Sequence, residues 1–253
     1  DQKWGLIPLL QEVQEAFADI VEDVGPDEIV RIEEALVSEG LDPEMIQPLC
    51  DVHVAVFREA LDAQSSPETL PGHPVFTFRA ENLGVERALD RLERALDDLK
   101  AEPGPETFEE ARTALDRLME YDKHYLRKEN ILFAYLERTE FSGPSKVMWG
   151  GHNDIRDQWQ ALDELLGESY DLETFEDEGM DEEIDAIFEP MAQAVRDMVY
   201  KEEKILFPAA LQRLSEAEWA EIREQGEEIG YCYARPGTYW QPGDEAQEEA
   251  EKA

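Results

Sequence analysis

Histidines and carboxylates stand at helical spacing around a short phrase that occurs twice in the chain. The first copy reads His124-Tyr-Leu-Arg-Lys-Glu129-Asn-Ile-Leu-Phe133, and the second reads Met198-Val-Tyr-Lys-Glu-Glu203-Lys-Ile-Leu-Phe207-Pro208. In each copy, ionisable residues precede an Ile-Leu-Phe run by one turn. Ionisable groups at such a depth are costly unless a partner compensates them. Imidazoles and carboxylates that converge inside a helical bundle are typical of a metal site, and iron is a usual occupant.

The apolar periodicity predicts which ionisable residues point inward. Glu129 shares a stripe with Tyr125 and Leu132, and His152 shares one with Ile155. Because several buried carboxylates lie among histidines, we expect a divalent cation to supply the missing positive charge. The candidate ligands come from all four long helical segments: His73 and Glu81, His124 and Glu129, His152, and Glu202 or Glu203.

Two of the four histidines also have a purely structural interpretation. His53 lies on an apolar stripe beside Cys50, where it is either a hydrogen-bonded core residue or a cover for the mouth of the bundle site. His73 follows Pro-Gly, so it can simply cap the start of a helix.

The carboxylates leave further alternatives open. Glu81 lies about 12 Å along a helix from His73, too far to share one ion comfortably, so it is a candidate for supporting a ligand. One of Glu202 and Glu203 is expected to be solvated. His124 and Glu129 are five residues apart, about 140° around an ideal helix, so both reach one centre only with a long carboxylate reach or a π-bulge.

The elements that must position these residues are helical throughout. We expect an all-α fold: an antiparallel four-helix bundle, a three-helix N-terminal appendage and a short C-terminal helix. The expected domains are 1–65, 66–235 and an acidic tail, 236–253. Ser215 and Glu218 form a capping-box signature for the last helix, through Gln225. The expected bundle helices are 74–100, 106–138, 146–166 and 181–213, and the appendage helices are 4–24, 27–38 and 43–63.

The charge balance excludes several classes of partner. The chain has 62 acidic and 23 basic residues, a net charge of −39. Such a surface repels nucleic acid and anionic membranes. The sequence contains no run of eighteen apolar residues, so we expect no membrane span. Acidic residues spread along every segment are typical of proteins from salt-accumulating microbes. No secretory signal is visible, and two cysteines make no disulfide framework, so we expect a cytoplasmic protein.

Five motifs, in order, resemble the hemerythrin-like (HHE cation-binding) family, in the subgroup whose bundle follows an N-terminal domain of unknown function. The resemblance covers about residues 5 to 235, and no PAS sensor domain follows, unlike in many longer relatives. The motifs are Leu49-Cys-Asp-Val-His53, Leu70-Pro-Gly-His73-Pro, His124-Tyr-Leu-Arg-Lys-Glu129-Asn, Val147-Met-Trp-Gly-Gly-His152-Asn-Asp-Ile-Arg156 and Lys201-Glu-Glu-Lys-Ile-Leu-Phe-Pro208.

The resemblance implies a non-haem di-iron centre. It makes His73, His124 and His152 terminal ligands, with Glu129 and Glu203 as bridges. Met198 departs from the family, because a histidine is common at that place, so Glu81, Glu202 or His53 is left to fill the vacancy. A site this rich in oxygen ligands favours Fe(III) or Mn, and Zn is a further possibility.

Three functions follow as expectations. In the first, the iron centre binds or reacts with a small diatomic ligand or peroxide: O2, NO or a peroxide. In the second, the chain is a regulatory module that senses redox state, oxygen, NO or iron and acts through a protein partner. In the third, it is a helical scaffold without metal. No residue has the features of a dedicated catalytic acid or base.

Overall fold

The structure is a computed structural model that describes residues 70–139, 143–167, 179–240 and 242. Every regular element within these ranges is helical, which confirms the expected all-α fold. The predicted appendage, with His53, and most of the predicted tail lie outside the described residues.

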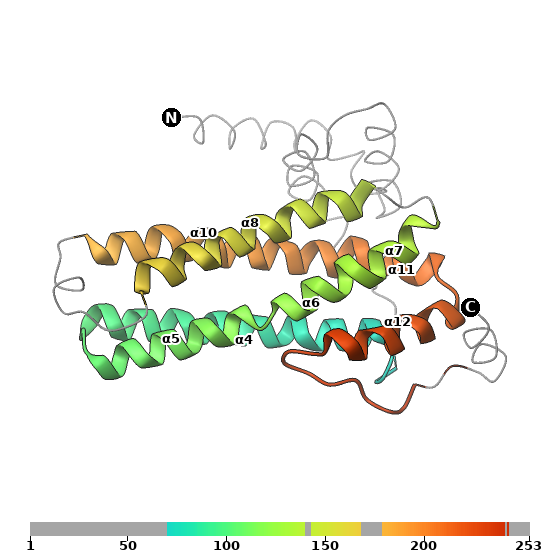
Figure 1. The fold of residues 1–253 in the computed structure, drawn as a ribbon, viewed down its shortest axis with the longest axis horizontal. Coiled ribbons are helices and arrows are strands. Elements are labelled where there is room, and N and C mark those ends of the chain that lie inside the picture. The colour runs from blue at the N-terminus through green and yellow to red at the C-terminus, as the bar shows by residue number, and fades with distance from the viewer. Residues whose placement is uncertain (1–69, 140–142, 168–178, 241, 243–253) are drawn as a thin grey trace, which may run out of the picture. The chain divides into compact units, whose positions relative to one another are not determined.

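The first bundle helices form an antiparallel hairpin. Helix α4 spans Pro74–Ala101, with a proline at its first position, where the missing N–H costs no intrahelical hydrogen bond. Helix α5 spans Pro105–Met119 and also begins with proline. The two helices lie side by side (Figure 1), joined by a short turn through Gly104.

The second predicted helix, 106–138, is interrupted. After α5 come α6 (Asp122–Arg127), the π-helix η1 (Lys128–Leu132) and α7 (Phe133–Glu137). Between α5 and α6 the backbone tightens, because the N–H groups of Tyr121, Lys123 and His124 each bond to the carbonyl three residues before. Apolar periodicity persists across this tightened turn, which is why the sequence pattern does not reveal it.

The remaining helices follow their predicted positions closely. The predicted helix 146–166 begins three residues earlier, as α8 (Gly143–Leu166). The predicted helix 181–213 contains a second π-helix, so it consists of α10, η2 and α11. Their bounds are Met180–Lys201, Glu202–Leu206 and Phe207–Arg213.

The chain divides into two compact units, and the candidate histidines of the described residues all lie in one of them. We call this one the bundle unit: Thr69–Leu132, Gly151–Val199 and Ser215–Ala253. The second unit consists of Asp1–Glu68, Phe133–Gly150 and Tyr200–Leu214; it contains η2 and α11.

Ion pairs between helices show the antiparallel order inside the bundle unit. On α4, Lys100 bonds to Asp185 at 2.7 Å, near the start of α10. Near the middle of α4, Glu86 pairs with Arg196 at 3.4 Å, near the end of α10. On α5, Arg112 bonds to Asp163 at 2.5 Å, near the end of α8, and at the start of α6 Asp122 bonds to Arg156 at 2.7 Å, so α8 runs opposite to the α5–α6 segment.

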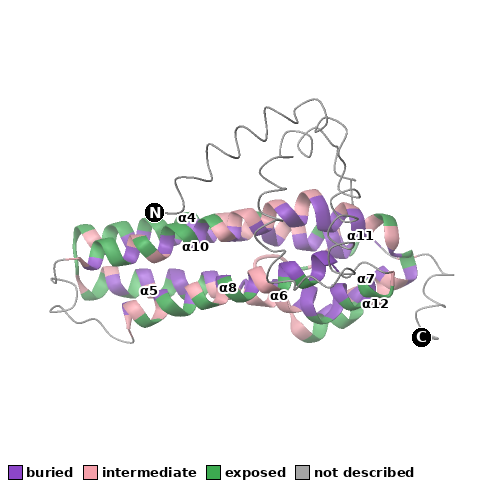
Figure 2. Cartoon of the chain, turned by 90° about the horizontal axis from the view of Figure 1, so that it is seen from above, coloured by how far each residue is buried: buried purple, intermediate pink, exposed green. Residues whose placement is uncertain are grey.

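The predicted inward faces are confirmed. Apolar stripes on all four bundle helices are buried, as the purple bands along the ribbons in Figure 2 show. The candidate ligands of the described bundle helices are buried too: His73, Glu81, His124, Glu129 and His152. Helical periodicity therefore identified the right faces, including those that carry charge.

A C-terminal helix covers one end of the bundle unit. Helix α12 (Glu216–Ile229) begins with the predicted capping box of Ser215 and Glu218, and it packs on α4, α6 and η1. We call residues 230–240, which follow it, the strap. The Trp240 N–H donates to the Pro71 carbonyl at 2.8 Å. The strap also approaches Gly72, whose φ of +107° favours glycine, so a side chain there would meet Gly237.

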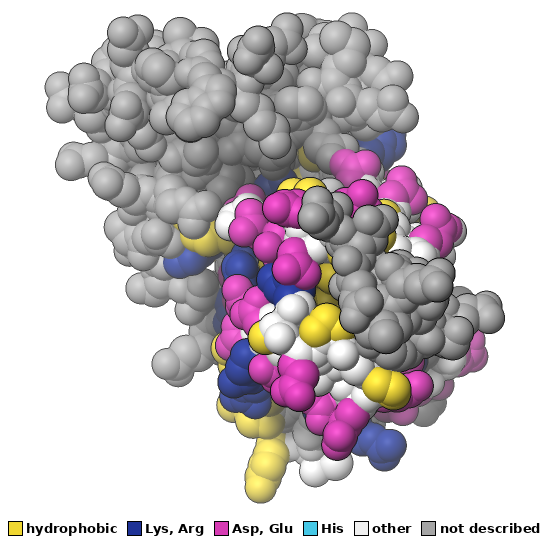
Figure 3. All heavy atoms as spheres, turned by 90° about the vertical axis from the view of Figure 1, so that its left-hand side faces the viewer, with side chains coloured by type: hydrophobic (Ala, Val, Ile, Leu, Met, Phe, Trp, Pro, Cys, Tyr) yellow, Lys and Arg dark blue, Asp and Glu magenta, His cyan; other side chains and the backbone are white. Residues whose placement is uncertain are grey.

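The surface of the described residues matches the acidic composition. On the face shown in Figure 3, acidic side chains are spread widely, with single lysines and arginines between them. None of the described helices is long and apolar enough to cross a membrane.

Candidate metal centre

The first candidate cluster joins α4 to α6 through Glu81 and His124, both fully buried. The Nδ1 atom of His124 lies 3.0 Å from Oε2 of Glu81, and the Arg127 guanidinium donates to the same oxygen. The ring of Tyr121 stacks on the His124 ring, with 4.4 Å between centroids. We call these four residues the His124 cluster.

Glu81 is held in its charged form. Burial opposes that form, but the hydrogen bond and charge of His124, followed by those of Arg127, lower the pKa of Glu81 from 4.5 to about 2. Since an ionised carboxylate can only accept hydrogen bonds, Nδ1 of His124 must carry a proton and donate it.

The strap closes this cluster. Its Cys232 N–H donates to Oε1 of Glu81 at 3.1 Å, and the Tyr231 ring lies against the Arg127 guanidinium, 4.5 Å from its centre. Burial, and next the negative charge of Glu81, raise the pKa of the Cys232 thiol above its usual range. Because the thiolate is the form that binds metals, Cys232 is not poised as a ligand here.

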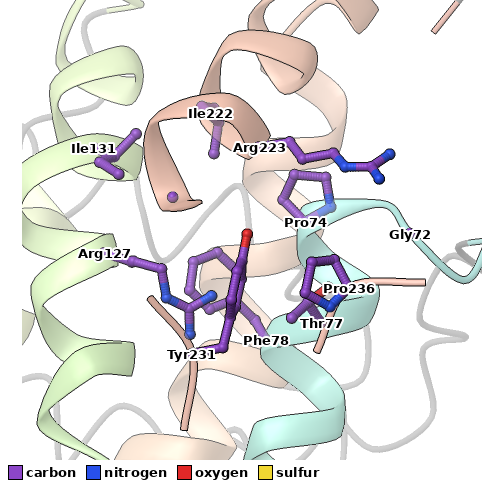
Figure 4. A pocket seen from close by; sticks show the side chains of 11 residues that line it. Gly72, Pro74, Thr77, Phe78, Arg127, Ile131, Ile222, Arg223, Tyr231 and Pro236 are labelled. Carbon is purple, nitrogen blue, oxygen red and sulfur yellow. The ribbon is translucent and has the colours of Figure 1, made fainter. Parts of the chain in front are cut away.

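A small hollow lies beside Arg127 and Tyr231. It has an empty volume of about 300 Å³, part of it open to solvent, and residues of α4, α12 and the strap line it. Figure 4 shows the Arg127 and Tyr231 side chains facing one another, with the Phe78 ring behind them. The hollow therefore reaches a residue of the His124 cluster from outside.

The second candidate cluster joins α8 to η1. The Nδ1 atom of the fully buried His152 lies 2.7 Å from Oε1 of Glu129. Arg156 holds both oxygens of Glu129 at 2.9 Å, and it also bonds to Asp122 at 2.7 Å. The Tyr125 ring stacks on His152, with 4.1 Å between centroids. We call His152, Glu129, Arg156 and Tyr125 the His152 cluster.

Lys128 lies on the opposite side of the His152 ring. It is fully buried, and its Nζ atom is 3.1 Å from Nε2 of His152 and 4.7 Å from the centre of the Tyr125 ring. Both oxygens of Glu129 accept hydrogen bonds from Arg156, and Oε1 also accepts one from Nδ1 of His152. In the neutral imidazole, Nε2 then accepts a hydrogen bond from the Lys128 ammonium.

His73 joins neither cluster. Its Nδ1 accepts a hydrogen bond from the Val75 N–H at 3.2 Å, and its ring packs against Trp219 and Trp240. Burial lowers the pKa of His73 from 6.5 to about 4, so it is neutral and Nε2 carries its proton. Coordination through Nε2 would require that proton to leave and the cap to change. The geometry matches the capping alternative, and a ligand role for His73 stays a prediction.

Both copies of the repeated phrase contain a π-helix. The π-bulge, one of the two alternatives predicted from the His124–Glu129 spacing, is present as η1, and η2 occupies the same place in the second copy. In η2, which belongs to the second unit, Glu202 is fully buried and Glu203 is partly exposed. Burial therefore favours Glu202 as the inward residue, and the choice of ligand between the two stays a prediction.

The chain's own cations already balance the two clusters. Three cations that the sequence analysis did not single out lie in or against them: Arg127 faces Glu81, Arg156 faces Glu129 and Asp122, and Lys128 faces the His152 ring. They lie in the quoted motifs, within four residues of His124 or His152. Charge type alone, however, does not distinguish an inward cation from a solvated one.

The donor chemistry fits a metal ion, although the donors are paired with one another. In each cluster a carboxylate takes Nδ1, so coordination would use Nε2, the usual arrangement of a metal-binding histidine. At His152 the Lys128 ammonium now lies on that nitrogen. Within residues 70–139, 143–167, 179–240 and 242, no three His, Cys, Asp or Glu side chains gather closely enough to hold a metal. A metal-bound state would therefore need some of these hydrogen bonds to open.

Comparisons with known proteins support the family resemblance. Residues 8–63 match a family of unknown function, DUF438, and residues 73–210 match the hemerythrin HHE cation binding domain. No curated protein matches the chain. The second match covers more than half of the chain and includes both clusters. The chain therefore belongs to the hemerythrin HHE cation-binding family, with a DUF438 domain before its metal-binding bundle.

Proposed function

We propose that the bundle holds a non-haem di-iron centre that binds or reacts with O2, NO or peroxide. The observation that carries this proposal is the pair of buried imidazoles, His124 and His152. Each is fixed at Nδ1 by a carboxylate, at 3.0 and 2.7 Å. Two such pairs in one core are the arrangement that orients Nε2 atoms toward metal ions.

The residues that would hold the metal follow from the two clusters. His124 and His152 are the imidazole ligands through Nε2. Glu129 is the carboxylate ligand within the bundle unit, and Glu81 orients His124; a second carboxylate ligand, Glu202 or Glu203, is proposed from the sequence alone. Bound iron would supply an open coordination position and redox chemistry for the small ligand. To become a bridging ligand, Glu129 must give up hydrogen bonds that it now accepts from Arg156 or His152.

The chain's own residues contribute three further effects. The carboxylates hold the imidazole rings in one orientation, and stacking on Tyr121 and Tyr125 limits their rotation. Burial keeps bulk water away from both rings. The hollow beside Arg127 has an empty volume of only about 300 Å³, part of it open to solvent, which suits a small ligand better than a large substrate.

Metal analysis tests the proposal. Protein produced with added iron should contain bound iron, and His124→Ala and Glu129→Ala should each lose most of it. Asp157→Ala is the matched control, because Asp157 is exposed on α8. Optical spectra of the oxidised and reduced protein, with O2, NO and peroxide, then identify the ligand. Equal metal content in all three variants would overturn the site assignment.

A second candidate function is sensing of redox state, oxygen, NO or iron through a protein partner. One observation favours it: Glu81 contacts both His124 and the Cys232 N–H of the strap, so a change at the cluster reaches the surface segment. Turnover of peroxide or NO by the iron-loaded protein favours the first function, whereas binding without turnover favours this one.

A further inference from the structure

Lys128 occupies the place on His152 that a metal ion would use. Its Nζ atom is 3.1 Å from Nε2, while Glu129 takes Nδ1 on the other side of the ring. An imidazole nitrogen has one lone pair, so it cannot accept a hydrogen bond from an ammonium and coordinate a metal together.

We propose that Lys128 is a built-in cation that blocks the metal position at His152, so that a metal ion enters there only when Lys128 withdraws. The inference rests on the proposed metal site and adds a residue that controls its loading. It predicts that the two histidines differ: the His152 position binds metal more weakly than the chemistry of its donors implies.

The surroundings of Lys128 support this role. The side chain is fully buried, and its ammonium also lies over the face of Tyr125, 4.7 Å from the ring centre. Aromatic faces attract cations, so Tyr125 helps hold Lys128 against His152. The π-helix contributes as well, because its wider turn brings both Lys128 and Glu129 into the core.

Charge favours the exclusion too. The Lys128 ammonium replaces one positive charge that a metal would otherwise bring, and two cations on the same nitrogen would repel each other strongly in a buried site. At the His124 cluster, the added cation is Arg127, which binds Glu81, the carboxylate that accepts from Nδ1 of His124.

The test compares Lys128→Met with wild type. Methionine keeps an unbranched side chain of similar length but removes the ammonium. Chelator-treated protein is titrated with Fe(II) without oxygen, and with Co(II) as a spectroscopic probe. The variant should take up one more ion per chain, or bind at the His152 position about tenfold to a hundredfold more tightly, the scale on which neighbouring residues alter metal affinity.

Lys123→Met is the matched control, because it removes a lysine from the preceding turn, where the side chain is 43% exposed and pairs weakly with Glu120. It should leave metal binding unchanged. Lys128→Gln provides a second variant if methionine disturbs folding, which circular dichroism of the metal-free protein checks. Adding His152→Ala to Lys128→Met should remove the gain.

The outcomes separate this inference from the proposed function. A gain in Lys128→Met supports the blocking role, even if wild type binds no ion and the di-iron proposal fails. Two ions bound by wild type and variant with equal affinity would overturn the blocking role and leave the di-iron proposal standing. Absence of binding in both proteins would overturn both.

Discussion

The His124 and His152 clusters are built from the same parts. Each has a fully buried imidazole, a carboxylate at Nδ1, an arginine on that carboxylate and a tyrosine stacked on the ring. In the His124 cluster the ring comes from α6 and its carboxylate from α4, whereas in the His152 cluster the ring comes from α8 and its carboxylate from η1. The fold therefore fixes two core histidines with the same set of residue types.

The clusters differ in how they are closed. Around Glu81, the Cys232 N–H and a guanidinium that is only 4% exposed complete the hydrogen bonding. Around Glu129, the arginine is 25% exposed and has a second partner, Asp122. The carboxylate should therefore matter most at Glu81, whose arginine is the more deeply buried of the two.

The largest expected effect is on stability when the buried carboxylates are neutralised. In metal-free protein, Glu81→Gln should lower the free energy of unfolding by about 3–5 kcal/mol, since Arg127 loses its buried counter-charge. Glu129→Gln should lower it by about 1–3 kcal/mol, because Arg156 keeps Asp122 and some water. Urea denaturation followed by circular dichroism measures both.

Glu86→Gln controls for the loss of an acid from α4. Its carboxylate is 39% exposed and pairs with Arg196 at the surface, so the change should be below about 1 kcal/mol. Equal destabilisation by Glu81→Gln and Glu129→Gln would show that closure by the strap does not distinguish the clusters.

The sequence predicted the buried helix faces and the π-helix better than it predicted the charge partners of the buried residues. Periodicity placed Glu129 and His152 inside, because apolar neighbours at three- and four-residue spacing fix a helix face. The five-residue gap between His124 and Glu129 predicted either a long carboxylate reach or a π-bulge, and η1 is present there. Those features depend on local helix geometry, which can be deduced from the sequence.

The charge partners could not be predicted in the same way. Lys128 and Glu129 both lie at helical spacing from Tyr125 and Leu132, and an α-helix gives little reason to bury both. The π-helix buries both, and a lysine on its own resembles a solvated residue. The pairing of Glu81 with the strap joins residues 151 positions apart, a relation that no local pattern reveals.

Acid should remove the difference between wild type and Glu81→Gln. Because the pKa of Glu81 is lowered from 4.5 to about 2, its contribution to stability is fully present above pH 4.5 and is lost as the pH falls toward 2. The shift corresponds to about 3 kcal/mol. Denaturation of both proteins across this range should show their free energies of unfolding converging, and a constant gap would contradict the charged state of Glu81.

The smallest expected effect concerns His73. This histidine belongs to neither cluster, so its variant provides a reference for the variants within the clusters. His73→Asn keeps a side-chain acceptor for the Val75 N–H but removes the imidazole. Because the pKa of His73 is lowered from 6.5 to about 4, wild type loses stability as the pH falls through this range, where the unfolded chain binds the extra proton.

As the pH falls from 7 to 5, the free energy of unfolding of the variant should therefore rise by about 2 kcal/mol relative to that of wild type, by linkage alone. At pH 7 it should be less stable by about 1 kcal/mol, because the ring contacts with Trp219 and Trp240 are lost. Denaturation of the metal-free proteins measures both values. Iron analysis of the same variant decides the remaining question about this histidine. Retained iron means that His73 only caps α4, whereas loss of iron as large as in His124→Ala means that the cap rearranges to bind metal and that the clusters share a third imidazole.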